Sequence, residues 1–167
     1  MQIPRRKSEE FKKRDDGPIY LTEAGLRELK SEFARLKVAL PGYIEEAART
    51  AAYGDRSDNA EYKDAKGRLR RAHYRIAEIE DQLKRISIIK SGPSASGKVE
   101  LGSTVVLEVD GGQKIYQILG ARETNPGEGR ISHVSPLGAA LMGRSSGETV
   151  SIQTPKGPRE YRILEVR

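Results

Sequence analysis

The sequence contains no cysteine and no tryptophan, and it has only two histidines. Without cysteine the chain can form neither disulfides nor thiolate metal sites, and His73 and His133 alone do not make a typical zinc site. No apolar run approaches the roughly 20 residues that a membrane-spanning helix needs. The Arg5-Arg6 pair is not followed by the apolar stretch of an export signal. We therefore expect a cytoplasmic protein that does not enter a membrane.

Charge is abundant by contrast. The 167 residues include 30 lysines and arginines against 24 acids, which gives a formal net charge of +6. A basic balance favours an acidic or nucleic-acid partner, although a charge of this size is weak evidence by itself. The length suits one ordinary domain or two small ones.

Two apolar series with helical spacing flank the segment GDRSDNAEY, residues 54–62. The first series consists of Leu26, Leu29, Phe33, Leu36, Leu40, Ile44, Ala48 and Ala51. The second consists of Tyr62, Ala65, Leu69, Ala72, Ile76, Ile79, Leu83 and Ile86. Steps of three and four residues are typical of helices that pack along a narrow seam, and the two series pair in order if the chain folds back between them. The pattern predicts a long antiparallel helical hairpin.

The ends of the two helical arms carry recognisable signals. We expect the first arm over residues 22–52, with Thr22 as its N-cap. Pro41 interrupts this arm, and a proline inside a helix loses a backbone hydrogen bond. We expect a kink or a restart of the helix there, which either aims the tip or is a tolerated junction. The second arm is expected from Asp58 to Ile89.

Changes in composition divide the chain into four parts. Residues 1–18 mix both charges and end in Gly-Pro, which is typical of a flexible tail. Residues 19–90 form the hairpin, with an acidic tip at 54–59. Residues 91–98 are rich in serine, glycine and proline and read as a linker. Residues 99–167 follow a period of two and predict a small α+β domain.

The C-terminal domain shows two strand pairs around turn signals. Strands are expected at 104–109, 114–119, 130–132, 149–153 and 160–166. Ser135 is expected to cap a short helix that ends at Met142. The expected core is Val105, Leu107, Ile115, Ile118, Ile131, Leu137, Leu141, Val150, Ile152, Ile163 and Val166. No catalytic constellation is visible in this domain, which favours a binding or docking module.

Asp55 and Asp58 are the only acids in the predicted turn. Two carboxylates can hold Mg²⁺, but this ion usually draws further ligands from water, phosphates or other acids, so the pair is half a site. Alternatively, Asp58 is the N-cap of the second arm, with Glu61 completing a capping box. Ser57 and Asn59 are either turn residues or hydrogen-bonding partners of a ligand.

Just beyond the turn, six cations face a single acid, Asp64, within 13 residues. They are Lys63, Lys66, Arg68, Arg70, Arg71 and Arg75. Such a segment is either a solvated helix face or a contact for a phosphate backbone. Tyr62 lies on the seam and is expected to pack, and His73 is expected to pack rather than act as a general base.

Four segments resemble the bacterial Gre transcript-cleavage factors, and the resemblance extends over nearly all of residues 20–167. They are YLTEAGLRELKSEF at the start of the first arm, GDRSDNAEY at the turn, ISHVSPLGAALMG and GETVSIQTPKG. Arg56 and the basic segment GRLRRAHYRI look more like the B-type factors of this family than the A-type ones.

The resemblance implies an α+β protein with an N-terminal coiled coil that enters the secondary channel of RNA polymerase. An FKBP-like C-terminal domain would dock on the channel rim. The chain would be a monomer. It would not be an enzyme itself but would stimulate the polymerase to cleave its own backtracked RNA.

By position, the resemblance makes Asp55 and Asp58 the acids that help to hold a Mg²⁺ shared with the polymerase. Ser57 and Asn59 become supporting tip residues. The candidates to contact the nascent RNA 3′ end are Lys63, Lys66, Arg68, Arg70 and Arg71.

The chain departs from the family pattern at Asp58, where these factors usually carry glutamate. The shorter side chain keeps a second hypothesis open, a channel-binding regulator that inhibits or competes without stimulating cleavage. A self-sufficient metal nuclease is disfavoured because the tip offers two carboxylates and no histidine. The longer charged tail and the pair Leu137-Gly138 are further departures.

Overall fold

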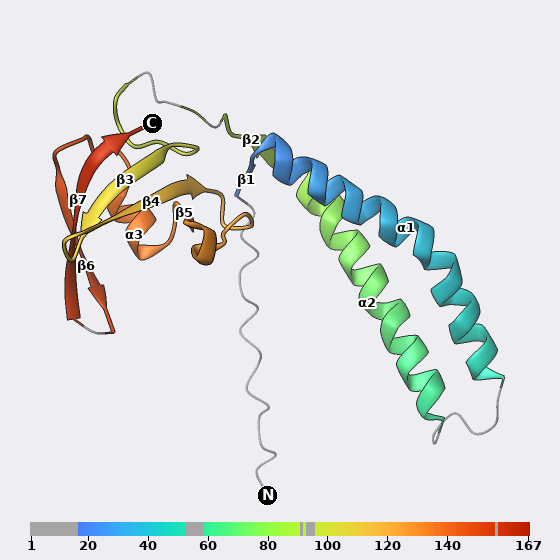
Figure 1. The fold of residues 1–167 in the computed structure, drawn as a ribbon. Coiled ribbons are helices and arrows are strands. Elements are labelled where there is room, and N and C mark those ends of the chain that lie inside the picture. Colours follow the sequence, from blue (N-terminus) through green and yellow to red (C-terminus); the bar gives the residue numbers. More distant parts are fainter. Residues whose placement is uncertain (1–16, 53–58, 91, 93–95, 156) are drawn as a thin grey trace, which may run out of the picture.

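A computed structural model describes residues 17–52, 59–90, 92, 96–155 and 157–167. The helices α1 (Glu23–Ala51) and α2 (Ala60–Leu83) form a hairpin that projects from a small sheet domain, with its free end far from that domain (Figure 1). The expected tail, apart from Gly17 and Pro18, lies outside the described residues, and so do Asp55, Ser57 and Asp58. Across the described ranges, no helix is long and apolar enough to cross a lipid bilayer.

Helix α1 begins where the sequence predicts. Thr22 is the N-cap, and its hydroxyl oxygen accepts a hydrogen bond from the Gly25 N–H at 3.1 Å. The helix continues through Pro41, so the prediction of a restart was wrong. Pro41 is exposed, so its ring faces solvent, and helix formers flank it on both sides. At 29 residues, α1 is about 43 Å long.

The seam of α1 differs from the prediction in the half that follows Pro41. Ile44 is 48% exposed and Ala48 is also exposed, whereas Ala47 and Thr50 are buried against α2. Steps of three and four residues continue from Leu40 to residues 43, 47 and 50, which keeps the 3.5-residue period of a two-helix seam. The predicted series followed the larger apolar side chain of Ile44 instead and drifted by one residue.

Helix α2 ends earlier than predicted. It stops at Leu83, and Ile86–Ile88 forms strand β2, which pairs in parallel with β1 (Ile19–Leu21) at the base of the hairpin (Figure 1). A turn precedes β2, in which the Arg85 N–H donates to the Gln82 carbonyl at 2.9 Å. The β-branched residues Ile86, Ile88 and Ile89 favour a strand, and β1 offers it a partner.

Apolar packing in the hairpin is concentrated at its base. Leu21, Leu29 and Ile79 are buried there, and the partly buried residues around them are Ile19, Phe33, Leu36, Leu83 and Ile86. Toward the free end, the buried apolar residues of the two arms are alanines, Ala47, Ala65 and Ala72. Alanines bury little area, so polar contacts between the arms matter more in the free half.

The C-terminal part is a five-stranded sheet with one short helix. Its strands are β3 (Thr104–Val109), β4 (Gly112–Leu119), β5 (Arg130–Ser132), β6 (Thr149–Thr154) and β7 (Gly157–Val166). Their order is β5-β4-β3-β7-β6, and only the β4–β5 pair is parallel. The predicted strands are confirmed to within three residues at each end.

Turn chemistry is also as predicted. Asp110 and Gly111 both have positive φ, 52° and 75°, as a tight two-residue hairpin turn between β3 and β4 requires. Ser135 caps α3 (Pro136–Leu141) by accepting from the Gly138 N–H at 3.1 Å. The short 3-10 helix η1 (Pro126–Glu128) was not predicted. Gly138 fits because a side chain there would collide with the Ser132 carbonyl oxygen.

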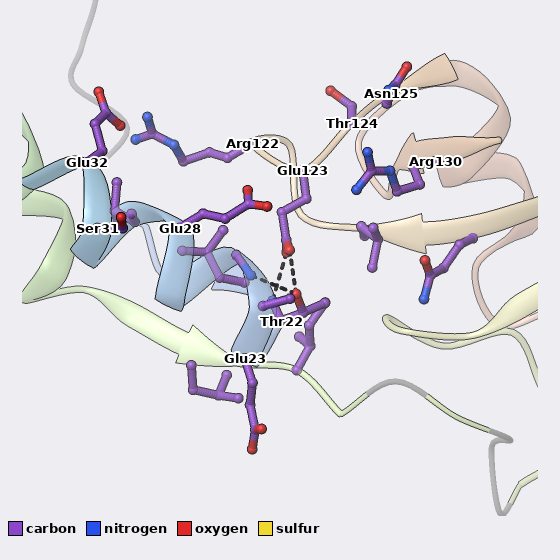
Figure 2. Close-up of a pocket in the computed structure, with 18 of the residues that line it drawn as sticks. Thr22, Glu23, Glu28, Ser31, Glu32, Arg122, Glu123, Thr124, Asn125 and Arg130 are labelled. Atoms are coloured by element: carbon purple, nitrogen blue, oxygen red, sulfur yellow. Dashed lines mark hydrogen bonds between the residues drawn. The ribbon is translucent and has the colours of Figure 1, made fainter. Parts of the chain in front are cut away.

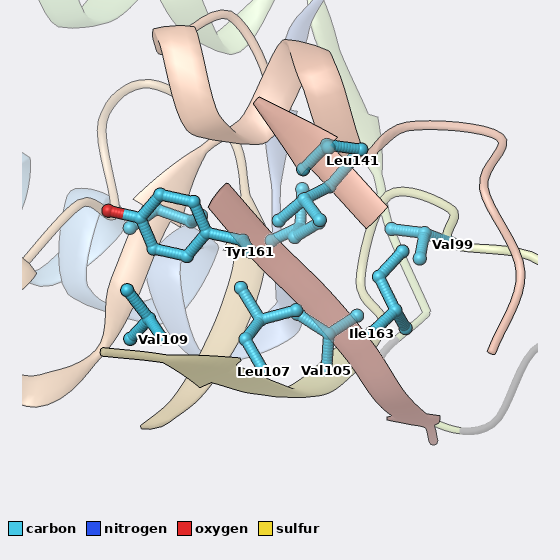
Figure 3. Close-up of a cluster of buried hydrophobic side chains, with 10 residues drawn as sticks. Val99, Val105, Leu107, Val109, Leu141, Tyr161 and Ile163 are labelled. Atoms are coloured by element: carbon cyan, nitrogen blue, oxygen red, sulfur yellow. The ribbon is translucent and has the colours of Figure 1, made fainter. Parts of the chain in front are cut away.

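The core of the sheet domain lies between the sheet and α3 (Figure 3). The buried members are Val99, Val105, Leu107, Val109, Ile118, Ile131, Leu141, Val150, Tyr161 and Ile163. Leu137, Ile152 and Val166 are partly buried around them. Ile115 was expected in this core but is 60% exposed, because it pairs with Val106 rather than with the inward-facing residues of β3. Val99, Val109 and Tyr161 belong to the core but were not predicted there.

Candidate functional site

The free end of the hairpin is held together by Asn59. Its side-chain N–H donates to the Thr50 carbonyl at the end of α1 at 2.8 Å. Its side-chain oxygen accepts from the Tyr62 N–H in the first turn of α2 at 2.9 Å. One amide therefore joins the last turn of α1 to the first turn of α2.

This arrangement corrects the expected start of the second arm. Asn59, not Asp58, is the N-cap of α2, and the residue three positions on is Tyr62 rather than the acid of a capping box. Asparagine and aspartate are about equally good caps, so the sequence alone could not choose between the neighbours. The role predicted for Asp58 as a helix cap was wrong. Capping of α2 therefore does not depend on the acids expected at the tip, Asp55 and Asp58.

Replacing Asn59 by alanine should lower the free energy of unfolding of the hairpin by about 1 to 2 kcal/mol, since a cap and a cross-link are lost together. Asn59→Asp is the matched control, because aspartate keeps the acceptor for Tyr62 N–H but has no donor for the Thr50 carbonyl. It should fall between the wild type and Asn59→Ala in thermal unfolding followed by circular dichroism. Equal melting temperatures for all three proteins would contradict the role of Asn59 in joining the two helices.

The basic segment of α2 divides into two groups. Lys63, Lys66, Arg70 and Arg71 are exposed, and no ion pair involves them among the described residues. The Lys66 ammonium lies 5.6 Å from the centre of the Tyr62 ring. We call these four residues the basic face. Its cations are open to a polyanion.

Arg68 does not share this freedom. Its guanidinium contacts Glu46 on α1 at 2.7 Å and Asp64 one turn earlier at 3.2 Å. The contact to Glu46 joins the two arms in the half of the hairpin that has little apolar packing. The structure thus gives Arg68, predicted as an RNA contact, a structural partner on the other helix.

Arg75 makes a similar connection nearer the base. Two of its nitrogens donate to the two carboxylate oxygens of Glu32 on α1, each at 2.7 Å, and a third contacts Glu78. The hydrogen bond from Arg75 lowers the pKa of the Glu32 carboxyl, and the charges of Arg75 and Arg122 lower it further.

Two further residues of α2 were expected to pack against α1. Tyr62 is half-buried on the seam, as predicted. His73 is exposed, so its predicted packing was wrong.

No group of three or more histidines and acids that could hold a metal occurs in the ranges that the structure describes. Ser57, Asp55 and Asp58 fall within residues 53–58, so their predicted roles stay predictions. The two acids are carboxylates of the kind Mg²⁺ prefers, but two ligands are fewer than this ion needs. A complete magnesium site built from the tip would draw its remaining ligands from water or from a partner.

A cleft of about 1270 Å³ lies at the other end of the hairpin, where α1 meets the sheet domain (Figure 2). Both charges line it, including Glu28 and Glu32 from α1 and Arg122 and Glu123 from the loop that follows β4. Glu123 contacts Thr22 at the start of α1. The hydrogen bonds between Thr22 and Glu123 therefore join the two parts of the protein at this cleft.

Comparisons with known proteins cover both parts of the chain. The family model described as "Transcription elongation factor, N-terminal" matches residues 19–88, and "Transcription elongation factor, GreA/GreB, C-term" matches residues 94–167. A relative from Anaeromyxobacter sp. (strain K), named transcription elongation factor GreA, is 40% identical over 151 residues, with 89% of this chain and 91% of the relative covered. A protein of the same name from Neisseria meningitidis serogroup B is 42% identical over 153 residues, with 89% and 97% covered.

Among solved structures, the GreA factor homolog 1 (Gfh1) of Thermus thermophilus is 32% identical, with 90% of this chain and 99% of that chain covered and a TM-score of 0.40.

Proposed function

The chain belongs to the GreA/GreB family of transcription elongation factors, and from this premise we propose that it enters the secondary channel of RNA polymerase and stimulates cleavage of backtracked RNA. The polymerase is the enzyme in this scheme, and the factor is its activator. The chain would act in the cytoplasm, as a monomer, wherever the polymerase stalls.

The feature that best supports this proposal is the shape of the hairpin. Two helices of 29 and 24 residues carry a short acid-bearing segment at an end that lies far from the sheet domain (Figure 1). A slender probe of about 40 Å can reach a site that a globular domain cannot enter. The sheet domain, with its separate core, would dock at the entrance while the probe extends inward.

Asp55 and Asp58 are the residues that we propose to act in the polymerase active site, with Ser57 supporting them. They would supply carboxylate ligands to a Mg²⁺ that the polymerase holds only in part. When bound, such an ion supplies Lewis-acid stabilisation for the hydrolysis of a phosphodiester. Asn59 would support these acids indirectly, because it fixes the ends of the two helices that flank them in the sequence.

The direct test is RNA cleavage in a defined backtracked polymerase complex, measured with and without the factor. We expect faster loss of the RNA 3′ segment when the factor is present. Cleavage at the same rate in both reactions would refute the proposal. Incubation of the factor with naked RNA and Mg²⁺ should give no product, and a product there would indicate a nuclease instead.

The competing function is a channel-binding regulator that does not stimulate cleavage. The shorter carboxylate of Asp58 is the feature that favours it. Under this alternative the factor would bind the polymerase and slow RNA synthesis, while cleavage would begin only in the variant Asp58→Glu. The same backtracked complex distinguishes the two functions.

The basic face should determine how well the factor acts on long extruded RNA. Replacing Lys63, Lys66, Arg70 and Arg71 together by serine should weaken cleavage of complexes with long 3′ segments and spare those with short ones. Each lost phosphate contact should lower the slope of log affinity against log salt by about 0.7. The control is Arg68→Ser, which removes the contact to Glu46 and should mainly lower hairpin stability. A uniform loss on short and long segments would contradict this role.

We further propose that the factor is of the B type, on the basis of Arg56 and this basic segment. The relatives compared above carry the name GreA. A preference for cleaving long backtracked RNA segments would support the B type. Cleavage of short segments alone would contradict it.

A further inference from the structure

The first turn of α1 lacks half of a common capping arrangement. In a capping box the N-cap side chain binds the N–H three residues later, and a Glu or Gln at that position binds the N–H of the N-cap. Thr22 provides the first half, through its contact with the Gly25 N–H at 3.1 Å. The residue at the later position is Gly25, which has no side chain to provide the second half.

Glu123 supplies the missing carboxylate from the sheet domain. One of its oxygens accepts from the Thr22 N–H at 2.7 Å, and the other accepts from the Thr22 hydroxyl (Figure 2). A Cβ at residue 25 would collide with the Glu123 carboxylate, so the glycine leaves the space that this side chain occupies. The negative charge also lies at the N-terminal end of the helix, where it is favoured.

The loop that carries Glu123 is itself held in place. The Glu123 N–H donates to the Gly120 carbonyl at 3.2 Å, and Asn125 and Arg130 exchange backbone hydrogen bonds at 2.9 and 3.0 Å. Gly120 lies so close to the Tyr20 carbonyl that a side chain there would collide with it. Tyr20 also meets the ring of His133 edge-on, with 5.5 Å between ring centres. The contacts around Glu123 therefore connect a fixed loop to the base of the hairpin.

We propose that Glu123 is a positioning residue, which completes the capping box of α1 from the other domain and so fixes the direction in which the hairpin leaves the sheet domain. The hairpin amplifies any motion at this joint. A rotation of about 10° at the base of a helix about 43 Å long moves its far end by about 7 Å. Catalytic groups tolerate displacements of only about 1 Å. The contact between Glu123 and Thr22 at the base of the hairpin therefore sets the position of its free end.

The distance between the two parts can be measured directly, because the chain has no cysteine of its own. Spin labels at Val38→Cys on α1 and Lys114→Cys on β4 occupy exposed positions away from the joint. The wild-type pair should give a single narrow distance distribution by pulsed electron paramagnetic resonance. Glu123→Ala should lose that narrow peak, and Glu165→Ala, an acid of the same domain that contacts Arg167, should keep it.

The double variant Gly25→Glu with Glu123→Ala separates positioning from helix capping. Its new glutamate can cap Thr22 from within the helix, so helix content and melting should match the wild type. The distance distribution should nevertheless be broad, since no side chain then reaches across from the sheet domain. A narrow wild-type distance in this variant, or in Glu123→Ala, would overturn the proposal. The measurement uses no polymerase, so its outcome is independent of the proposed function.

Discussion

Asparagine in place of Asp55 is expected to reduce factor-stimulated RNA cleavage by about 100-fold or more, a loss at least as large as that seen when a partner of a metal ligand is removed. Asparagine keeps the size of the side chain but offers a neutral oxygen, which binds Mg²⁺ less strongly than a carboxylate does. Asp58→Asn should behave similarly. The measurement is the rate of RNA cleavage in a backtracked polymerase complex at saturating factor.

Two controls separate loss of chemistry from loss of binding. Each variant should still compete with the wild-type factor for the polymerase, because the hairpin and the sheet domain are unchanged. Raising the Mg²⁺ concentration should restore part of the activity if the lost carboxylate recruits the ion. Asp58→Glu should cleave at least as fast as the wild type. Full activity of Asp55→Asn would show that the acid at this position has no part in the reaction.

Replacing Leu107 by alanine is expected to destabilise the sheet domain by about 2 to 5 kcal/mol, since this side chain is fully buried and its loss leaves a cavity. Leu107 lies on β3, the central strand, between β4 and β7. A small domain is stable by only about 5 kcal/mol, so a large fraction should be unfolded. Denaturant unfolding, with hydrogen exchange to assign the loss to a segment, measures the effect.

Ile115→Ala is the matched control, because it removes a similar side chain from the neighbouring strand. Ile115 is 60% exposed, so the change in the free energy of unfolding should stay within about 0.5 kcal/mol. Hydrogen exchange of α1 and α2 should be little altered in either variant, since the hairpin has its own apolar cluster at the base. An equal effect of the two substitutions would contradict the assignment of the core.

The sequence predicted those elements whose signals are local. Thr22 as N-cap, the turn at Asp110 and Gly111 and the Ser135-Pro136 helix start all depend on neighbouring residues, and all three are confirmed. Strands of the sheet domain were also found, because alternation of apolar and polar residues needs only one face to be buried.

Predictions failed where the outcome depended on a partner distant in the chain. Residues 86–88 continue the helical apolar spacing, but β1 is present beside them and they form a strand. Ile115 and Ile118 are three residues apart on β4 and therefore face opposite sides of the sheet, and it is Ile118 that meets the core while Ile115 lies on the open face. The seam beyond Pro41 was placed on Ile44, whereas the packing of α2 selects Ala47 and Thr50.

The candidate site shows the same division. The acids and cations near the turn are visible in the sequence, because charge and spacing are properties of a short segment. Only the folded chain shows that Arg68 is engaged by Glu46 and that Asn59 bridges the two helices. Neither contact has a local signal, since each joins residues on different helices.

The amino-acid sequence alone determined that this protein is a helical hairpin followed by a small α+β domain, with two acids at the turn, because periodicity and composition are written in consecutive residues. The tertiary structure decided which cations are open to a polyanion, which side chain closes the end of the hairpin and how α1 is attached to the sheet domain. Glu123 and Thr22 are 101 positions apart, and only folding brings a carboxylate to the Thr22 N–H, because the residue three positions later, Gly25, has no side chain to bind it.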